Sequence, residues 1–134
     1  SHFWLGLTQA HTGLYEEAES SLLKALELSP VDPEISTFFT GLFFANFGQK
    51  NYEKALEAID NSLRLKPGRG NIMGFRASAL GELNSSEAKE ALNRYLTLRP
   101  NLKKRDDYRS IFVPNSTLAD PIIEGLIKAG WQPE

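Results

Sequence analysis

Apolar and small residues recur at helical spacing in three similar blocks of this chain. The blocks read YEEAESSLLKALELSP over residues 15–30, YEKALEAIDNSLRLKP over residues 52–67 and SSEAKEALNRYLTLRP over residues 85–100. In the first block Ala18, Leu22, Ala25 and Leu26 lie three or four positions apart, except for the adjacent last two. This spacing places them on one helix face. Each block ends in a proline, which cannot continue a helix. Such a repeat predicts a stack of helical hairpins.

Each block supplies the second helix of a hairpin, and the stretch before it supplies the first. The predicted helices cover about residues 1–12 and 15–28, 34–47 and 52–65, and 71–83 and 86–98. A short helix is predicted within residues 103–112. Asp120 and Pro121 suit the start of a final helix, because Asp caps free N–H groups and Pro fits the first turn. We expect this helix to cover the open end of the stack, with Trp131 as an anchor.

Composition and charge narrow the class of partner. The chain has 134 residues, the size of one domain, with 15 basic and 17 acidic residues and a net charge of −2. This balance argues against nucleic acid, which is bound through basic patches. The absence of cysteine excludes disulfides and thiolate metal sites and fits a reducing compartment. Residues 38–47, the longest apolar stretch, are too few and too interrupted to span a bilayer. We therefore expect a cytoplasmic protein that binds neither nucleic acid nor membrane.

The repeated spacing carries a family resemblance. The first copy has a Leu-Gly pair at Leu5-Gly6, followed by Tyr15, Ala18, Leu22, Ala25 and Pro30. The second copy keeps this pattern with Ser62 in place of a small alanine, and the third departs from it at Ser85 and Tyr95. Over about residues 1–100 the chain resembles the tetratricopeptide repeat (TPR) family.

The resemblance implies an all-α, right-handed superhelical solenoid in one domain, residues 1–134. Its three TPR-like hairpins would cover about residues 1–33, 34–68 and 69–101, and residues 102–134 would form a C-terminal capping segment. The tail, residues 120–130, is similar to C-terminal TPR regions of multidomain bacterial signalling proteins, which carry a cyclase or winged-helix domain upstream. We therefore expect this chain to be a bacterial segment of a longer protein.

In this family the first helix of each hairpin lines a concave surface. The resemblance places these residues in an apolar, aromatic partner-binding groove there: Phe3, Leu7, His11, Thr37, Thr40, Phe44, Phe47, Met73, Ala77 and Leu80. Some members of the family hold a peptide carboxylate with Lys, Asn and Arg on these faces. The matching positions here are Phe3, Leu7, Gly41 and Gly74, so no carboxylate clamp is carried over.

The leading prediction is a non-catalytic scaffold that binds an apolar peptide or helix of a protein partner in this Phe-rich groove. Three covers for Phe44 and Phe47 stay open: a ligand segment, a second copy of the chain, or the chain's own Ile111-Phe112-Val113 stretch. The alternative function is an assembly module that forms a homodimer through the apolar first helix, where Trp4 lies.

Catalytic chemistry has little support in the sequence. His2 and His11 have no carboxylates at metal-binding spacing, so no metal is expected. Gly68-Arg69-Gly70 lacks the Lys-Ser/Thr of a phosphate loop and is interpreted as a turn. No nucleophile and base are spaced as a pair. An enzyme fragment remains the alternative from another class, and we predict no catalysis and no cofactor.

Overall fold

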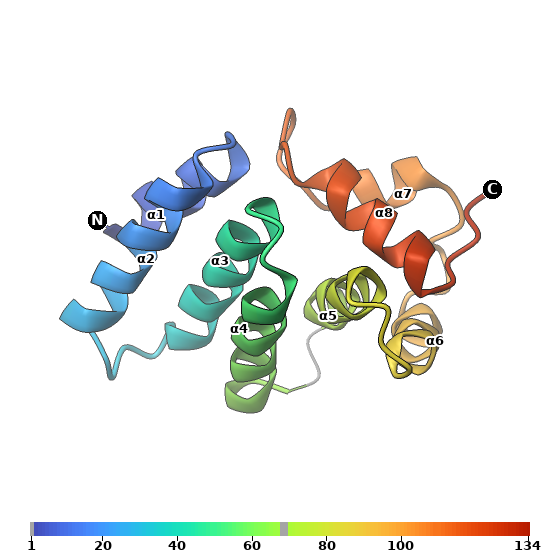
Figure 1. Cartoon of the computed structure of the whole chain (residues 1–134), viewed down its shortest axis with the longest axis horizontal. Helices are drawn as coiled ribbons and strands as arrows, with labels where there is room; N and C mark the ends of the chain where they lie inside the picture. Colours follow the sequence, from blue (N-terminus) through green and yellow to red (C-terminus); the bar gives the residue numbers. More distant parts are fainter. Residues whose placement is uncertain (1, 68–69) are drawn as a thin grey trace.

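The computed structural model describes residues 2–67 and 70–134, without the side chains of His2 and Phe3, and this part is helical with no strand (Figure 1). Its helices are α1 (His2–His11), α2 (Tyr15–Leu28), α3 (Ile35–Gly48), α4 (Tyr52–Leu65), α5 (Gly70–Glu82), α6 (Ala88–Leu98), α7 (Arg105–Arg109) and α8 (Ala119–Ala129). The predicted all-α repeat fold is confirmed. The turn predicted at Gly68 and Arg69 falls outside the described residues. None of the described helices is long and apolar enough to cross a membrane.

The three hairpins share one turn geometry. A residue with positive φ stands in each turn: Gly13 at 92°, Lys50 at 61° and Asn84 at 54°. The next N–H donates to a carbonyl oxygen near the end of the first helix, on Gln9, Asn46 and Leu80, at 2.8, 2.9 and 3.0 Å. These three residues therefore occupy matching positions in successive hairpins, and other positions can be matched from them.

Small and bulky residues alternate where the hairpins stack. Ala18, Ala55 and Ala88 are buried, as are Leu22, Ile59 and Leu92 one turn further along. Leu22 lies close to Gly6 on α1 and to Gly41 on α3, where a Cβ atom would lie about 3 Å or less from it. Each such bulky side chain stabilises the stack by roughly 1.5–3 kcal/mol through burial.

The position of α8 corrects the sequence prediction. This helix packs mainly across α5 and makes little contact with α6 at the open end of the stack (Figure 1). Gly81 on α5 and Gly125 on α8 let the two backbones approach closely, and Ser78 Oγ donates to the carbonyl oxygen of Ile122 at 2.7 Å. Only small residues allow two helices to cross this closely. The pattern of apolar residues did not indicate which helix α8 would pack against.

The chain after α8 reaches the third hairpin. Gly130 ends α8 with a φ of 122°, which a glycine adopts readily. Trp131 is buried, and its ring lies 6.1 Å from that of Tyr108, so it serves as the predicted anchor. Trp131 also lines a pocket with Leu92 and Leu96 of α6.

Candidate functional site

The residues predicted to line a concave groove do not share one open surface in the described part of the chain. Phe47, Ala77 and Leu80 are core residues, and the side chain of Phe3 lies outside the described residues. Thr40 faces its own partner helix, because its Oγ1 lies 2.9 Å from Ser62 Oγ on α4.

The other predicted residues also separate. Leu7 lies beside Gly41 at the contact between α1 and α3, and Thr37 Oγ1 donates to the carboxylate of Glu34, the residue just before α3. Met73 lines a groove between α4 and α6. His11 and Phe44 meet directly, with ring centroids 5.1 Å apart. The physical reason is that the first helices are covered on more than one side, so residues at groove spacing divide between several contacts.

His11 and Phe44 belong to an aromatic wall that we define as His11, Phe43, Phe44 and Phe75. Phe75 lies 5.5 Å from Phe43 and 5.1 Å from Phe44, measured between ring centroids. The chain's own Phe112 lies over this wall, 6.4 Å from Phe44 and 6.0 Å from Phe75. Of the three covers considered from the sequence, the chain's own stretch is the one seen here.

Phe112 belongs to a crossing segment, residues 110–117, that runs from the C-terminal helices back to the first hairpin. The N–H of Thr117 donates to the carbonyl oxygen of His11 at 3.1 Å, and Thr117 Oγ1 lies 2.7 Å from the Tyr15 hydroxyl. His11 Nδ1 lies 3.0 Å from Ser116 Oγ. Burial lowers the pKa of His11, which favours the neutral ring in this contact.

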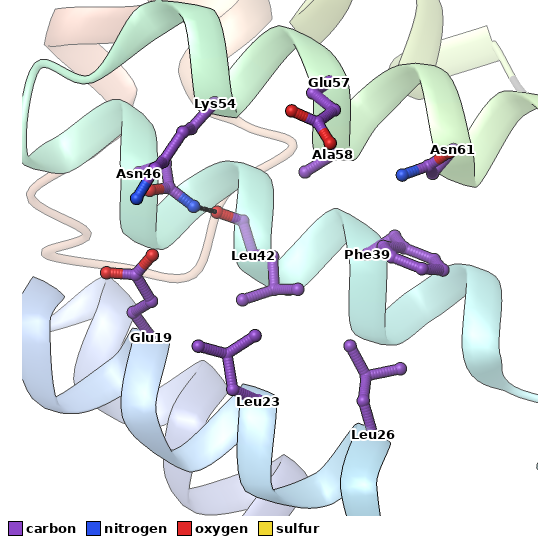
Figure 2. Close-up of a pocket in the computed structure, with 10 residues that line it drawn as sticks. All are labelled: Glu19, Leu23, Leu26, Phe39, Leu42, Asn46, Lys54, Glu57, Ala58 and Asn61. Atoms are coloured by element: carbon purple, nitrogen blue, oxygen red, sulfur yellow. Dashed lines mark hydrogen bonds between the residues drawn. The ribbon is translucent and has the colours of Figure 1, made fainter. Parts of the chain in front are cut away.

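An open groove lies on another face of α3, between α2 and α4, with a volume of about 310 Å³ (Figure 2). We call it the first groove. Its lining residues are Glu19, Leu23, Leu26, Phe39, Leu42, Asn46, Lys54, Glu57, Ala58 and Asn61. Leu23, Leu26 and Phe39 make an apolar trough, while Glu19, Asn46 and Lys54 gather at one end (Figure 2).

The second groove is the matching space one hairpin further on, between α4 and α6, with a volume of about 330 Å³. Its lining residues are Asp60, Leu63, Pro67, Met73, Arg76, Ala91 and Arg94. Asp60 and Arg76 occupy the positions that Leu23 and Leu42 occupy in the first groove. Their ion pair, with Arg76 Nε 2.7 Å from Asp60 Oδ1, bridges the second groove.

Asn46 in the first groove is a polar residue with an unusual environment. It is only 4% exposed, and its Nδ2 donates to the carbonyl oxygen of Leu42 at 2.9 Å. Its Oδ1 accepts no hydrogen bond from any residue that the structure describes. At the matching position in the first hairpin, Gln9 Oε1 accepts from Ser21 Oγ at 2.8 Å. In the second hairpin the place of Ser21 is taken by Ala58, which has no hydroxyl.

Sequence reasoning did not select Asn46. The only signal was an amide in the middle of the apolar helix of residues 38–47, which was treated as an interruption of that stretch. Its meaning depends on Ala58 across the hairpin and on the hydrogen bonds around it, and neither follows from spacing.

Comparison with known families agrees with the hairpin geometry. Residues 1–32, which hold α1 and α2, match the family model of the tetratricopeptide repeat. No curated protein matches the chain. The matched hairpin shares its turn geometry with the two hairpins that follow it.

Proposed function

Because the chain carries a tetratricopeptide repeat, followed by two hairpins of the same geometry, we propose that it is a non-catalytic scaffold that holds an apolar segment of a partner protein against its aromatic wall. Tetratricopeptide repeats mediate protein–protein interactions and are typically non-catalytic. The partner would contribute an aromatic or aliphatic side chain in the position that Phe112 now takes.

The observation that supports this proposal is the placement of Phe112 itself. Its ring meets Phe44 and Phe75 from a segment that is partly exposed, and the neighbouring Val113 is 55% exposed. Beyond Phe112, Ser116 and Thr117 hold the segment to the first hairpin. The crossing segment thus acts as an internal stand-in for a bound peptide, and a partner segment would compete with it.

The test removes the Phe112 side chain from the aromatic wall and supplies the crossing segment again as a separate peptide. Phe112→Ala should let a synthetic peptide of residues 109–117 bind in trans, with amide shifts around Phe44 and Phe75 in an NMR titration. The wild-type chain should bind the same peptide about tenfold more weakly, because its wall is already covered. The matched control is Val113→Ala, which should behave like wild type because Val113 is exposed.

Apolar burial would drive this binding, so affinity should change little between about 0.05 and 0.5 M salt. If Phe112→Ala does not fold, the pair Ser116→Ala and Thr117→Val loosens the tip of the segment without emptying the wall, because it removes the side-chain bonds to His11 and Tyr15 and leaves the backbone bond from the Thr117 N–H to His11. Equal affinity of the peptide for wild type and for both released variants would contradict the proposal.

A second candidate function is assembly through the first hairpin, favoured by exposed apolar side chains there. Trp4 is 67% exposed and Leu5 is 51% exposed on α1, and Val31 after α2 is 91% exposed. Apolar patches of this kind often mark contact surfaces. Sedimentation velocity over a range of concentrations tests it, with Leu5→Lys as the disrupting variant. A chain that stays monomeric at the highest concentration would rule this candidate out.

A further inference from the structure

We propose that the first groove is a second binding site, separate from the aromatic wall, and that it takes an extended apolar peptide segment of a partner protein flanked by basic residues. The inference does not depend on the proposed function, because the groove lies on a different face of α3 and Phe112 does not line it. It follows from the trough, the amide at its end and the charges around it.

The trough has the size and lining of a side-chain site. Its volume of about 310 Å³ is comparable with that of small ligand pockets. Leu23 is 51% exposed on its rim, and Leu26 and Phe39 are partly buried beside it. An apolar side chain that enters the trough would remove these surfaces from water, which favours binding.

Asn46 indicates which group lies beside that side chain. A buried acceptor without a donor costs about 1–3 kcal/mol of stability. The other two hairpins avoid this cost, the first by pairing Gln9 with Ser21 and the third by placing Leu80 there. A ligand that donates a hydrogen bond to Asn46 Oδ1 would remove the same cost in the second hairpin.

A single residue of an extended peptide can satisfy the polar end of the groove. In an extended chain the N–H and the C=O of one residue point to the same side. Its N–H can therefore donate to Asn46 Oδ1 while its carbonyl oxygen accepts from the ammonium group of Lys54, which lines the same end (Figure 2). The Asn46 amide is covered, so side chains at this end of the groove must shift when the peptide enters.

Charge complementarity favours basic flanks. Glu19 and Glu57 line the groove against the single basic residue Lys54. Glu19 Oε1 accepts from Gln49 Nε2 at 3.2 Å and has no basic partner in the described part of the chain. A lysine or arginine on either side of the apolar residue would meet these carboxylates and steer the peptide to this face.

The experiment uses the whole chain and a defined probe, the capped peptide acetyl-Lys-Leu-Phe-Leu-Lys-amide. NMR titration should show amide shifts in α2, α3 and α4 around the groove. Replacing the flanking lysines of the probe by glutamates should weaken binding about tenfold, and a capped Lys-Ser-Asn-Ser-Lys peptide should not bind measurably.

Two variants test the role of Asn46. Asn46→Leu copies the third hairpin, and the double variant Asn46→Gln with Ala58→Ser copies the Gln9–Ser21 pair of the first. Each variant should bind the probe about tenfold more weakly than wild type does, while its free energy of unfolding is at least that of wild type. Leu98→Ala, at an exposed apolar residue of α6 that lines neither groove, is the control and should leave the affinity of the probe unchanged.

Three outcomes would overturn the inference. The first is no binding by wild type at millimolar probe. The second is equal affinity for wild type and both Asn46 variants, which would leave the amide without a role. The third is a concentration-dependent dimer that Leu23→Asp abolishes, because a second copy of the chain would then be the occupant of the groove.

Discussion

The first and second grooves have the same architecture and opposite chemistry. Each lies between the second helices of neighbouring hairpins, over the first helix of the later hairpin. Where the first groove has Leu23 and Leu42, the second has Asp60 and Arg76, joined across the space at 2.7 Å. Where the first has Asn46 with an unpaired acceptor, the matching residue is Leu80, which is buried with no polar atom to satisfy.

This difference shows how a repeat fold separates stability from recognition. The buried positions that hold the hairpins together keep their chemical type in all three repeats, as Leu22, Ile59 and Leu92 do. The groove positions change their chemical type from one groove to the next, as Leu23 and Asp60 or Leu42 and Arg76 do. The second groove has satisfied its own polar groups, whereas the first has left one unsatisfied.

The largest effect should come from the support beneath the first groove. Leu22→Ala should lower the free energy of unfolding by about 2–5 kcal/mol, because it leaves a cavity between α1, α2 and α3. Leu23→Ala, on the rim of the groove, should lower the free energy of unfolding by less than about 1 kcal/mol. Chemical denaturation of both variants measures the difference, and equal costs would show that the rim is part of the core.

Asn46→Leu should make the first groove resemble the second and raise the free energy of unfolding by about 1 kcal/mol, since an unpaired buried acceptor is removed. The gain in stability should accompany the loss of peptide affinity described above. A thermal or denaturant midpoint that falls below that of wild type would show that the amide stabilises the fold.

The reverse exchange should make the second groove resemble the first. Asp60→Leu with Arg76→Leu should change the free energy of unfolding by no more than about 1 kcal/mol, because both side chains are partly exposed and such pairs contribute little. The exchange opens an apolar trough beside Leu63 and Met73, so the Lys-flanked peptide should cause new NMR shifts there. If the double variant unfolds, the ion pair is essential for joining the second and third hairpins.

The smallest expected effect is the dependence of stability on pH through His11. It should leave the difference between the two grooves unchanged. Because burial lowers the pKa of His11 in the folded chain, the unfolded chain binds more protons below its ordinary pKa of 6.5. Stability should therefore fall as the pH drops from about 6.5 towards the lowered folded value, and His11→Gln should remove that dependence. Denaturation of both chains between about pH 8 and pH 5 checks this. A peptide affinity that follows the same titration would mean that His11 influences the first groove, which it does not line.

The sequence predicted the helices well because their signals are local. The bounds of α2 and α4 agree with the spacing of apolar residues and the closing prolines. The start of α6 moved from Ser86 to Ala88, because Ser85 Oγ accepts from the N–H of Glu87 in a local turn ahead of the helix. A local turn of this kind shifts a boundary by a residue or two and leaves the hairpin intact.

The candidate sites were harder to predict because they depend on contacts between distant residues. The residues assigned to one concave groove divide between the core, the helix contacts and the aromatic wall, since α8 and Phe112 occupy that side of the stack. Spacing along a helix gives the face of a residue, but it does not say which element covers that face. The close crossing at Gly81 and Gly125 decided this, and it is visible only in three dimensions.

The hydrogen bonds between Thr117 and His11 also bear on how the molecule unfolds. Most tandem-repeat arrays behave as one-dimensional chains of nearest neighbours, in which an end unit can unzip without the others. Here the first hairpin is tied to the segment between α7 and α8. The first hairpin therefore cannot detach without also releasing that segment, so a terminal repeat should melt together with the rest. Versions of the chain shortened before the crossing segment should unfold less cooperatively.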